Sequence, residues 1–457
     1  MKWSSLLSRK RLGAAAAPEI AGPRTDFQRD FDRIIFSSAF RRMQDKTQVF
    51  PLAKNDYVRT RLTHTLEVAS VGRSLGALAG AHVLDQDREL GRKHGYTTAD
   101  FGAIVAAACL GHDIGNPPYG HAGEFAIQEW FRTSTLGQSI LRRLAPAQRA
   151  DFEKFEGNAQ GFRVLARLAM PDNVGGMQLT CATLGAVAKY PRTSWLPLPL
   201  SSGISSKKHG FFEADRGLFE AVASECGLIR RRAEEPAWYR HPLAFLVEAA
   251  DDICYRVVDV EDGFRAGELE YREIEPLYRA VVTGNDAWTK AASISTDEKR
   301  VEYLRARTID VLVREAAQIF SDAEKAILDG AFDGELVSLI PHAEALEAFR
   351  DLARKNVYQA APVIGIRHPG SSALGELLEA FVGATEKWAA GQRDPGMQEV
   401  LAMVPVQFVD ADRVASEALY GRVIGLTDFV AGMTDSFAAD MLRKVRVISS
   451  LPPVTQG

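Results

Sequence analysis

The feature that most constrains the fold is an apolar run that leads directly into a cluster of ionisable side chains. Residues 101–110 carry no charge, and His112 and Asp113 follow almost at once. An uncharged run of this length predicts a helix that is buried on all sides. The polar groups at its end would therefore stand on a rigid, buried support.

The polar cluster has the composition of a metal site with a second pair of residues beside it. His112 and Asp113 are adjacent, so on a helix they diverge by about 100° and can share only an ion that lies between them. Imidazole and carboxylate suit Zn, Mn, Fe or Mg better than a thiolate cluster does. Pro117 and Pro118 then end the helix, and a new helix near His121 would place Glu124 on the same face.

A lone His-Asp pair is more often a structural hydrogen-bonded pair than a metal site, because both residue types satisfy each other at helix ends. Here, two further segments supply ligands. His64 lies within the amphipathic segment 61–69, and Asp251 within the helical segment 248–255. We therefore predict that His64, His112, Asp113 and Asp251 bind one divalent ion.

Two more patterns indicate a phosphorylated ligand. Arg61 precedes His64 by three residues, which places its guanidinium on the side of the helix that would face a phosphate. Asp251, Tyr255 and Asp259 follow at four-residue steps, so they form one stripe about 12 Å long, enough for a nucleotide. Outside this constellation, the better interpretation would be a core tyrosine and a solvated aspartate.

The chain reads as all-α, with at most a short β-hairpin at residues 46–57. Apolar spacing of three and four predicts helices at 68–90, 99–110, 124–136, 152–168, 180–189, 242–260 and 301–327. We expect a flexible N-terminal arm (1–23) and a catalytic core (24–282) with an irregular insertion at about 191–210. Residues 283–457 would form a C-terminal helical region that completes the core and supplies an oligomer surface.

Charge and cysteine usage narrow the class of protein. A net charge of -4 from 55 basic and 59 acidic residues argues against a general nucleic-acid or membrane coat. No run approaches the roughly 20 apolar residues of a membrane helix. The four cysteines show no CxxC spacing, which is typical of buried, reduced thiols in a cytoplasmic protein. In the insertion, Lys207, Lys208 and His209 either reach anions or keep the loop soluble, and solubility is the favoured interpretation.

The order His64, His112-Asp113, Asp251 resembles that of the HD phosphohydrolase superfamily. The resemblance narrows to the bacterial deoxyguanosinetriphosphate triphosphohydrolases and their dGTPase-like relatives, which share motifs in the same order across residues 24–440. The matching segments are 46–50, 61–64, 112–124, 158–160, 189–191, 250–253 and 431–435. The resemblance implies an HD-domain helical core.

The resemblance also implies a reaction and its cofactor. Deoxynucleoside triphosphates, dGTP among them, would be hydrolysed at the α-phosphate to a deoxynucleoside and inorganic triphosphate. One divalent ion per subunit is implied, Mg²⁺ or Mn²⁺ first, with Co²⁺, Fe²⁺, Zn²⁺ or Ni²⁺ as options. The family also implies a homo-oligomer, a hexamer or tetramer, with a nucleotide or single-stranded DNA effector as a further option and no membrane partner.

Roles carry over residue by residue. Gln48 and Asp259 match positions that bind the sugar 3'-hydroxyl, and Tyr255 matches one that packs at C2' and disfavours ribose. His121 and Glu124 match the catalytic positions, with Glu124 orienting His121. The matches near the triphosphate are Arg61, Lys189 and Tyr190. At Asn116 some family members carry histidine, which leaves its effect on phosphate contacts open.

Two other classes stay open. A different HD phosphohydrolase, acting on another nucleotide, would keep the metal residues but would not need Gln48, Tyr255 and Asp259 in these places. A non-catalytic protein that binds nucleotides or single strands would be expected to lose His121 or a metal ligand, and the chain retains all of them.

Overall fold

The computed structural model describes residues 1–17, 22–48, 59–200, 203–358, 361–410 and 418–450. Regular structure in these ranges is helical, and β-structure is limited to isolated bridges. The all-α prediction is therefore confirmed. Most of the predicted hairpin 46–57, from residue 49 on, lies outside the described residues, and its residue Thr47 forms one antiparallel bridge with Thr60.

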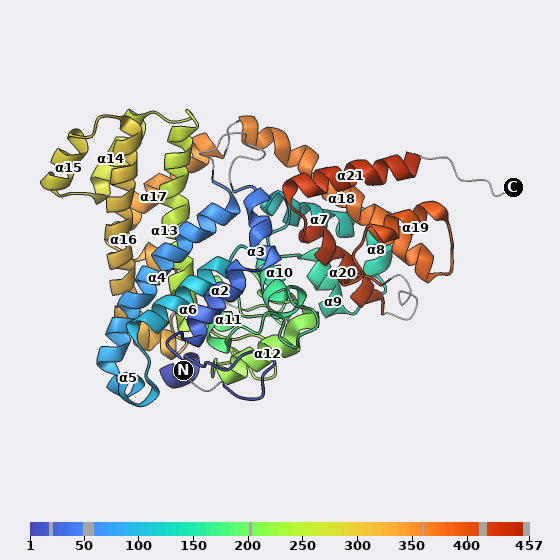
Figure 1. Ribbon diagram of the computed structural model, residues 1–457, viewed down its shortest axis with the longest axis horizontal. Coiled ribbons are helices and arrows are strands. Elements are labelled where there is room, and N and C mark those ends of the chain that lie inside the picture. The colour runs from blue at the N-terminus through green and yellow to red at the C-terminus, as the bar shows by residue number, and fades with distance from the viewer. Residues whose placement is uncertain (18–21, 49–58, 201–202, 359–360, 411–417, 451–457) are drawn as a thin grey trace.

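One group of helices packs around a central apolar helix, at the left and centre of Figure 1. The central helix, α6, contacts α2, α4, α11 and α13, while α13 also packs on α16 and α17. The bounds of this group are α2 (Asp26–Ile35), α4 (Arg61–Gln86), α6 (Thr98–Gly111), α11 (Cys181–Val187), α13 (Pro242–Arg265), α16 (Asp297–Leu328) and α17 (Ala343–Leu352). Their apolar faces form the first hydrophobic cluster.

A second group, at the right of Figure 1, has its own hydrophobic cluster. Its helices are α7 (His121–Thr133), α8 (Thr135–Leu141), α9 (Pro146–Glu153), α18 (Ala361–Ala389), α19 (Pro395–Ala402), α20 (Leu419–Ala431) and α21 (Asp435–Ser450). α18 contacts α7, α19, α20 and α21. Because residues 112–120 join α6 to α7, the polar motif lies where the two groups meet.

The remaining helices are short or peripheral. They are α1 (Trp3–Leu6), α3 (Ser38–Arg42), α5 (Arg88–His94), α10 (Gly157–Arg163), α12 (Arg216–Glu225), α14 (Tyr271–Val281) and α15 (Asn285–Ala292), with 3₁₀ turns at Met43–Asp45, Ile204–Ser206, Glu213–Asp215 and Leu336–Ser338. Two π-helical turns, Val164–Leu168 and Ala353–Val357, follow α10 and α17 directly. Such turns are frequent near functional sites.

Glycines allow α4 and α6 to approach closely. Gly72, Gly76 and Gly80 recur at four-residue steps on α4, so they share one face. A Cβ atom at Gly76 would lie 2.7 Å from the carbonyl oxygen of Phe101 on α6. This close contact fixes the spacing between the helix that carries His64 and the helix that ends at His112.

Local sequence also explains where these helices start. Thr60 caps α4, because its side chain accepts a hydrogen bond from Thr63 N while the Thr63 hydroxyl accepts one from Thr60 N. At α13, His241 is the cap and Pro242 occupies the first turn, where its missing N–H costs no hydrogen bond. Both site-bearing helices are therefore anchored at their N-termini.

The expected flexible arm is wrong where the structure describes it. Trp3, Leu6 and Leu7 are buried in the first hydrophobic cluster. Trp3 Nε1 donates to Glu324 Oε1 at 2.6 Å, and Arg11 forms ion pairs with aspartates of α2. These contacts join segments that are distant in the sequence, so no local pattern reveals them.

One helix boundary differs from the prediction. The helix expected at 152–168 is interrupted after α9, and the chain resumes as α10 and a π-helical turn. Within residues 283–457, α16 and α17 pack on the first group, and α18 to α21 form most of the second. The four cysteines are free and buried, as predicted. Among the described helices, none is long and apolar enough to span a membrane.

Candidate metal centre and substrate cavity

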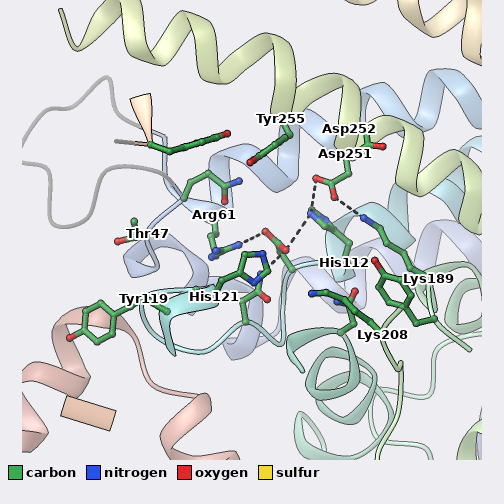
Figure 2. A pocket seen from close by; sticks show the side chains of 18 of the residues that line it. Thr47, Arg61, His112, Tyr119, His121, Lys189, Lys208, Asp251, Asp252 and Tyr255 are labelled. Carbon is green, nitrogen blue, oxygen red and sulfur yellow. Dashed lines mark hydrogen bonds and ion pairs between the residues drawn. The ribbon is translucent and has the colours of Figure 1, made fainter. Parts of the chain in front are cut away.

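A cavity of about 780 Å³ opens beside the end of α6 and contains most of the predicted site residues. Figure 2 shows its lining side chains converging from α4, α13 and the loop before α7. Of the predicted residues, those that line it are Gln48, Arg61, His112, Asp113, His121, Lys189, Tyr190, Asp251 and Tyr255. Predicted residues from six separate stretches of sequence therefore meet in one place.

Three predicted metal ligands converge. One ligand atom from each of His64, His112 and Asp251 lies within 4.8 Å of the other two. Asp251 Oδ1 is 3.2 Å from His64 Nε2 and 3.4 Å from His112 Nε2. Both histidines are buried. The donor set, two imidazole nitrogens and a carboxylate oxygen, suits a borderline or hard divalent ion.

The state of His112 supports the fit of a cation. Its Nδ1 lies 2.6 Å from the carbonyl oxygen of Cys109, which can only accept, so Nδ1 carries the proton. In the neutral ring, Nε2 then presents a lone pair, and it is buried without a hydrogen-bond partner. Burial lowers the pKa of His112, but the charges of Asp113 and Asp251 outweigh burial and raise it, so the two carboxylates favour a positive charge at Nε2, which a proton or a metal ion can supply. A divalent ion would satisfy both the lone pair and the carboxylates.

Asp113 lies beside the cluster of His64, His112 and Asp251 and is not one of its three members. Its Oδ1 is 3.6 Å from His112 Nε2 and accepts a hydrogen bond from Asn116 Nδ2 at 2.6 Å. Its Oδ2 pairs with Arg61 at 2.6 Å. Burial favours the neutral acid, but His112 and Arg61 prevail and lower the pKa of Asp113. The carboxylate is therefore ionised and available, while its role as the fourth ligand stays a prediction.

Lys189 links the cluster to the cavity wall. Its Nζ donates to Asp251 Oδ2 at 2.7 Å, on the opposite side of the carboxylate from the histidines. Burial lowers the pKa of Lys189, and the Asp251 charge more than offsets this and raises it. Lys189 is thus a fixed cation, and the Tyr190 ring beside it also lines the cavity.

His121 and Glu124, the predicted catalytic residues, form a hydrogen-bonded pair at the cavity. His121 starts α7 and projects into the cavity with a side chain that is 80% exposed, whereas Glu124 is buried. Glu124 Oε2 lies 2.6 Å from His121 Nδ1, and Glu124 Oε1 accepts from Gly157 N at 2.7 Å. The hydrogen bond to Glu124 raises the pKa of His121. Glu124 therefore fixes the ring so that Nε2 faces the cavity.

The segment between α9 and α10 brings Gly157 close to Glu124 and Asn116. A Cβ atom at Gly157 would lie 2.6 Å from Glu124 Oε1 and 2.3 Å from Asn116 Oδ1. Only glycine permits that approach. Gly120 has a φ of +58°, and a Cβ atom there would meet the Arg61 guanidinium at 2.5 Å.

The predicted sugar-binding residues are brought together only in part. Gln48 lines the cavity, and its Oε1 is buried without a partner. Tyr255 also lines the cavity, and its ring stacks on that of Tyr358 with centroids 5.9 Å apart. Asp259 is buried and does not line the cavity, because the Tyr358 hydroxyl lies against its carboxylate and donates to it. Burial raises the pKa of Asp259.

Several cavity residues were missed by the sequence analysis. Lys208, read as a solubility feature, lines the cavity and donates to Glu156 at 2.7 Å, so that reading is wrong. A signal was present in the buried aromatic pair Phe211 and Phe212, which anchors the loop. Arg354 and Tyr358 also line the cavity. Their four-residue spacing was visible, but their distance from every recognised motif gave no reason to select them.

The full-length similarity to known proteins agrees with the geometry. A protein of Synechocystis sp. named deoxyguanosinetriphosphate triphosphohydrolase-like protein is 42% identical over 456 residues, covering 98% of this chain and 100% of that protein. A protein of the same name from Pseudomonas aeruginosa is 38% identical over 455 residues, with the same coverage of both chains. A deoxyguanosinetriphosphate triphosphohydrolase of Cronobacter sakazakii is 31% identical, covering 92% of this chain and 94% of that protein. No family model matches the chain.

Proposed function

The chain belongs to the deoxyguanosinetriphosphate triphosphohydrolase family, and on this premise we propose that it hydrolyses deoxynucleoside triphosphates at the α-phosphate. The products would be a deoxynucleoside and inorganic triphosphate. One observation carries the proposal: a cluster that fits a divalent ion and a His-Glu pair face the same cavity, whose wall also holds Arg61, Lys189 and Lys208. This combination is suited to a triphosphate.

The residues that would hold the ion are His64, His112 and Asp251, with Asp113 as the fourth ligand. Bound there, Mg²⁺ or Mn²⁺ would supply a Lewis acid for the phosphate and lower the pKa of water. Carboxylate-rich sites favour Mg²⁺ or Mn²⁺, whereas two imidazoles also accept Co²⁺, Fe²⁺, Zn²⁺ or Ni²⁺. The identity of the ion therefore has to be measured.

The chain's own cations would bind and orient the triphosphate. Arg61 is held by Asp113 at 2.6 Å and Lys189 by Asp251 at 2.7 Å, so neither must be ordered when substrate arrives. Preorganised cations stabilise the negative charge that builds up on the triphosphate oxygens while the 5'-oxygen leaves, without further reorganisation. Lys208, held by Glu156, would add a third positive group.

His121 would move the proton. In the reaction, a water oxygen bonds to the α-phosphorus, the bond from that phosphorus to the 5'-oxygen breaks, and the 5'-oxygen gains a proton. His121 is exposed to the cavity and oriented through Nδ1, so its Nε2 can exchange a proton with the water or with the 5'-oxygen. The hydrogen bond and charge of Glu124 raise the pKa of His121, which favours the protonated form that can donate to the 5'-oxygen.

Selection for deoxyribose would rest on Tyr255. If the α-phosphate lies beside Asp251 and Gln48 accepts from the 3'-hydroxyl, C2' faces the Tyr255 ring. A 2'-hydroxyl there would lose its hydrogen bonds to water, at a cost of about 1–3 kcal/mol. We expect Tyr255→Ala to narrow the preference for deoxynucleotides over ribonucleotides. Triphosphate release from paired deoxy and ribo substrates would measure it, and an unchanged ratio would remove Tyr255 from this role.

The decisive experiment is a metal-dependent assay of inorganic triphosphate release from the four deoxynucleotides and their ribonucleotide counterparts. We expect release from at least one deoxynucleotide, dGTP first, with ribonucleotides as poor substrates and no release after chelation. Release of pyrophosphate or monophosphate would point to a different HD phosphohydrolase. Tight nucleotide binding without any turnover would identify a binding protein.

A further inference from the structure

A carboxylate outside the cavity ties its two sides together. Asp435, the first residue of α21, is 2% exposed. Its Oδ2 accepts hydrogen bonds from Thr47 N at 3.0 Å and from the Thr47 hydroxyl. Its Oδ1 accepts from Tyr119 N at 2.9 Å. The helix itself does not use this carboxylate for capping, because Thr434 Oγ1 already accepts from Phe437 N at 3.2 Å.

On one side, the carboxylate holds the strand-like segment that precedes Gln48. Gln48 follows Thr47 directly, and its unpartnered Oε1 belongs to the cavity wall. The preceding residue, Lys46, is buried and its Nζ donates to the carbonyl oxygens of Asn116 and Ala431. Its own carbonyl accepts from Arg61 N at 3.1 Å. The position of Gln48 is thus set by contacts with α4, the 112–120 loop and the end of α20.

On the other side, the carboxylate holds the turn that precedes His121. Tyr119 has a φ of +62°, a left-handed conformation that a residue with a Cβ atom rarely adopts. The bond from Tyr119 N to Asp435, together with one from the Tyr119 hydroxyl to the Asp435 carbonyl at 3.2 Å, maintains this conformation. In Figure 2, Tyr119 lies against the C-terminal helices, apart from the phosphate-facing residues. If these bonds were lost, the turn would relax and redirect His121.

We propose that Asp435 is a positioning residue that sets Gln48 and His121 at the correct separation across the substrate cavity. The inference rests on the proposed function, because it assigns Gln48 to the sugar 3'-hydroxyl and His121 to proton transfer. Asp435 does not line the cavity. It acts through the backbone of Thr47 on one side and of Tyr119 on the other.

The test is Asp435→Asn, which keeps the size of the side chain. Thr47 N and Tyr119 N donate to different oxygens of Asp435, and in asparagine one of these positions becomes an NH₂ group that can only donate, so one of the two backbone N–H groups loses its acceptor. The measurement is kcat and KM for the best deoxynucleotide and for its 2',3'-dideoxy analogue, which lacks the hydroxyl that Gln48 would bind. We expect the kcat/KM preference for the deoxynucleotide to fall about 10-fold, as for one lost hydrogen bond, and kcat to fall as well.

Two further variants separate positioning from simple loss of stability. Asp394→Ala removes a carboxylate that caps α19 through Met397 N at 3.2 Å, in the same half of the molecule but away from the cavity. It should lower the melting temperature and leave the deoxy/dideoxy ratio unchanged. Thr47→Val keeps the backbone N–H but removes the hydroxyl bond to Asp435, so it should lower the ratio with a smaller effect on kcat than Asp435→Asn.

The outcomes distinguish the two proposals. A wild-type enzyme that prefers the deoxynucleotide, combined with an unchanged ratio in both Asp435→Asn and Thr47→Val, would overturn the positioning role alone. If Asp435→Asn does not fold, Thr47→Val decides by itself. A wild-type enzyme that hydrolyses no deoxynucleotide, or that ignores the 3'-hydroxyl, would overturn the sugar assignment and the positioning role with it.

Discussion

At the scale of single residues, Asp251 is the group on which most of the site depends. Its Oδ1 faces both histidines, and its Oδ2 holds Lys189. Burial alone would favour the neutral acid, but Lys189 and His112 lower the pKa of Asp251 well below its usual range. Asp251 therefore contributes an oxygen atom to the candidate metal cluster, and its charge keeps the buried Lys189 protonated.

We expect Asp251→Ala to abolish binding of the divalent ion, because it removes a ligand and leaves Lys189 as an uncompensated charge facing the site. Metal content of the purified protein, measured by elemental analysis, checks this. The matched control is Asp252→Ala, since Asp252 is the adjacent carboxylate, is absent from the metal cluster and lies 3.9 Å from Arg256. Unchanged metal content in Asp251→Ala would contradict the metal assignment.

The His121-Glu124 pair predicts a change in pH dependence. Removing the Glu124 charge takes away the interaction that raises the pKa of His121, so that pKa should fall. In Glu124→Gln, the limb of the kcat profile that belongs to His121 should therefore move to lower pH. His121→Ala should lose about 100-fold or more of kcat and lose that limb, with its metal content unchanged. A limb that stays in place in Glu124→Gln, or loss of the ion in His121→Ala, would contradict these roles.

Sequence spacing predicted the residues that cluster but not their finer arrangement. His64, His112 and Asp251 could be selected because each lies on a helix with a recognisable pattern. Asp113 pairs with Arg61, which is 52 residues away in the sequence. The Tyr358 hydroxyl donates to Asp259, which is 99 residues away. Such contacts follow from tertiary packing, which local periodicity does not encode.

At the scale of elements, the approach of α4 to α6 sets the geometry of the metal centre. We expect Gly76→Ala to destabilise the protein by about 1–3 kcal/mol, the usual cost of overpacking. The added Cβ atom would lie 2.7 Å from a backbone oxygen and 2.9 Å from Gly102 Cα, neither of which can rotate away. Chemical denaturation measures the loss, and metal affinity should fall as His64 and His112 separate.

Gly217 supplies the control for this substitution. It lies in α12, and a Cβ atom there would meet nothing within 4 Å. Gly217→Ala should be neutral or stabilise by about 0.4–1 kcal/mol, because alanine favours helix and restricts the unfolded chain. Equal effects at Gly76 and Gly217 would show that helix propensity, and not the α4–α6 contact, determines the result.

Element prediction succeeded where one property dominated. The segment 101–110 is uniformly apolar, and the structure places it in the central helix α6. The expected helix at 152–168 has good periodicity, yet α9 ends at Glu153 and α10 begins at Gly157. The N–H of Gly157 donates to Glu124, a tertiary contact that a continuous helix would not allow. The N-terminal segment has short apolar stretches that predict no structure alone, and it is ordered by burial against helices far along the chain.

At the scale of the whole molecule, two hydrophobic clusters meet at the loop between α6 and α7. The candidate metal ligands come from the first group, whereas His121 and Glu124 belong to the second. The placement of the two helix groups relative to each other therefore determines whether the candidate metal ligands and His121 face the same cavity. Asp435 and Lys46, which bond across this boundary, give that placement a physical basis.

The last prediction concerns assembly. The family resemblance implies a tetramer or hexamer, and the sequence pattern predicts its surface in the C-terminal region 283–457, of which the motif-poor helical part 283–377 is the first candidate. Where side chains in that range are described, Leu339 is the one large apolar residue that is highly exposed, at 53%. Outside it, Phe36, which directly follows α2, is 79% exposed, and Val406 is 72% exposed. Exposed aromatic side chains mark association surfaces better than charged helix faces do. We therefore expect the oligomer to use faces outside 283–377.

Light scattering on the purified protein across a range of concentrations, with and without nucleotide, should give the mass of a tetramer or hexamer. Phe36→Ser should shift that equilibrium toward smaller species, since burial of one such side chain stabilises association by about 1.5–3 kcal/mol. Leu339→Ser, the matched loss of an exposed apolar side chain within 283–377, should leave the mass unchanged. A monomer under every condition would refute the assembly. If Leu339→Ser dissociates the oligomer and Phe36→Ser does not, the interface lies within 283–377, because only a side chain that is buried between subunits would have that effect.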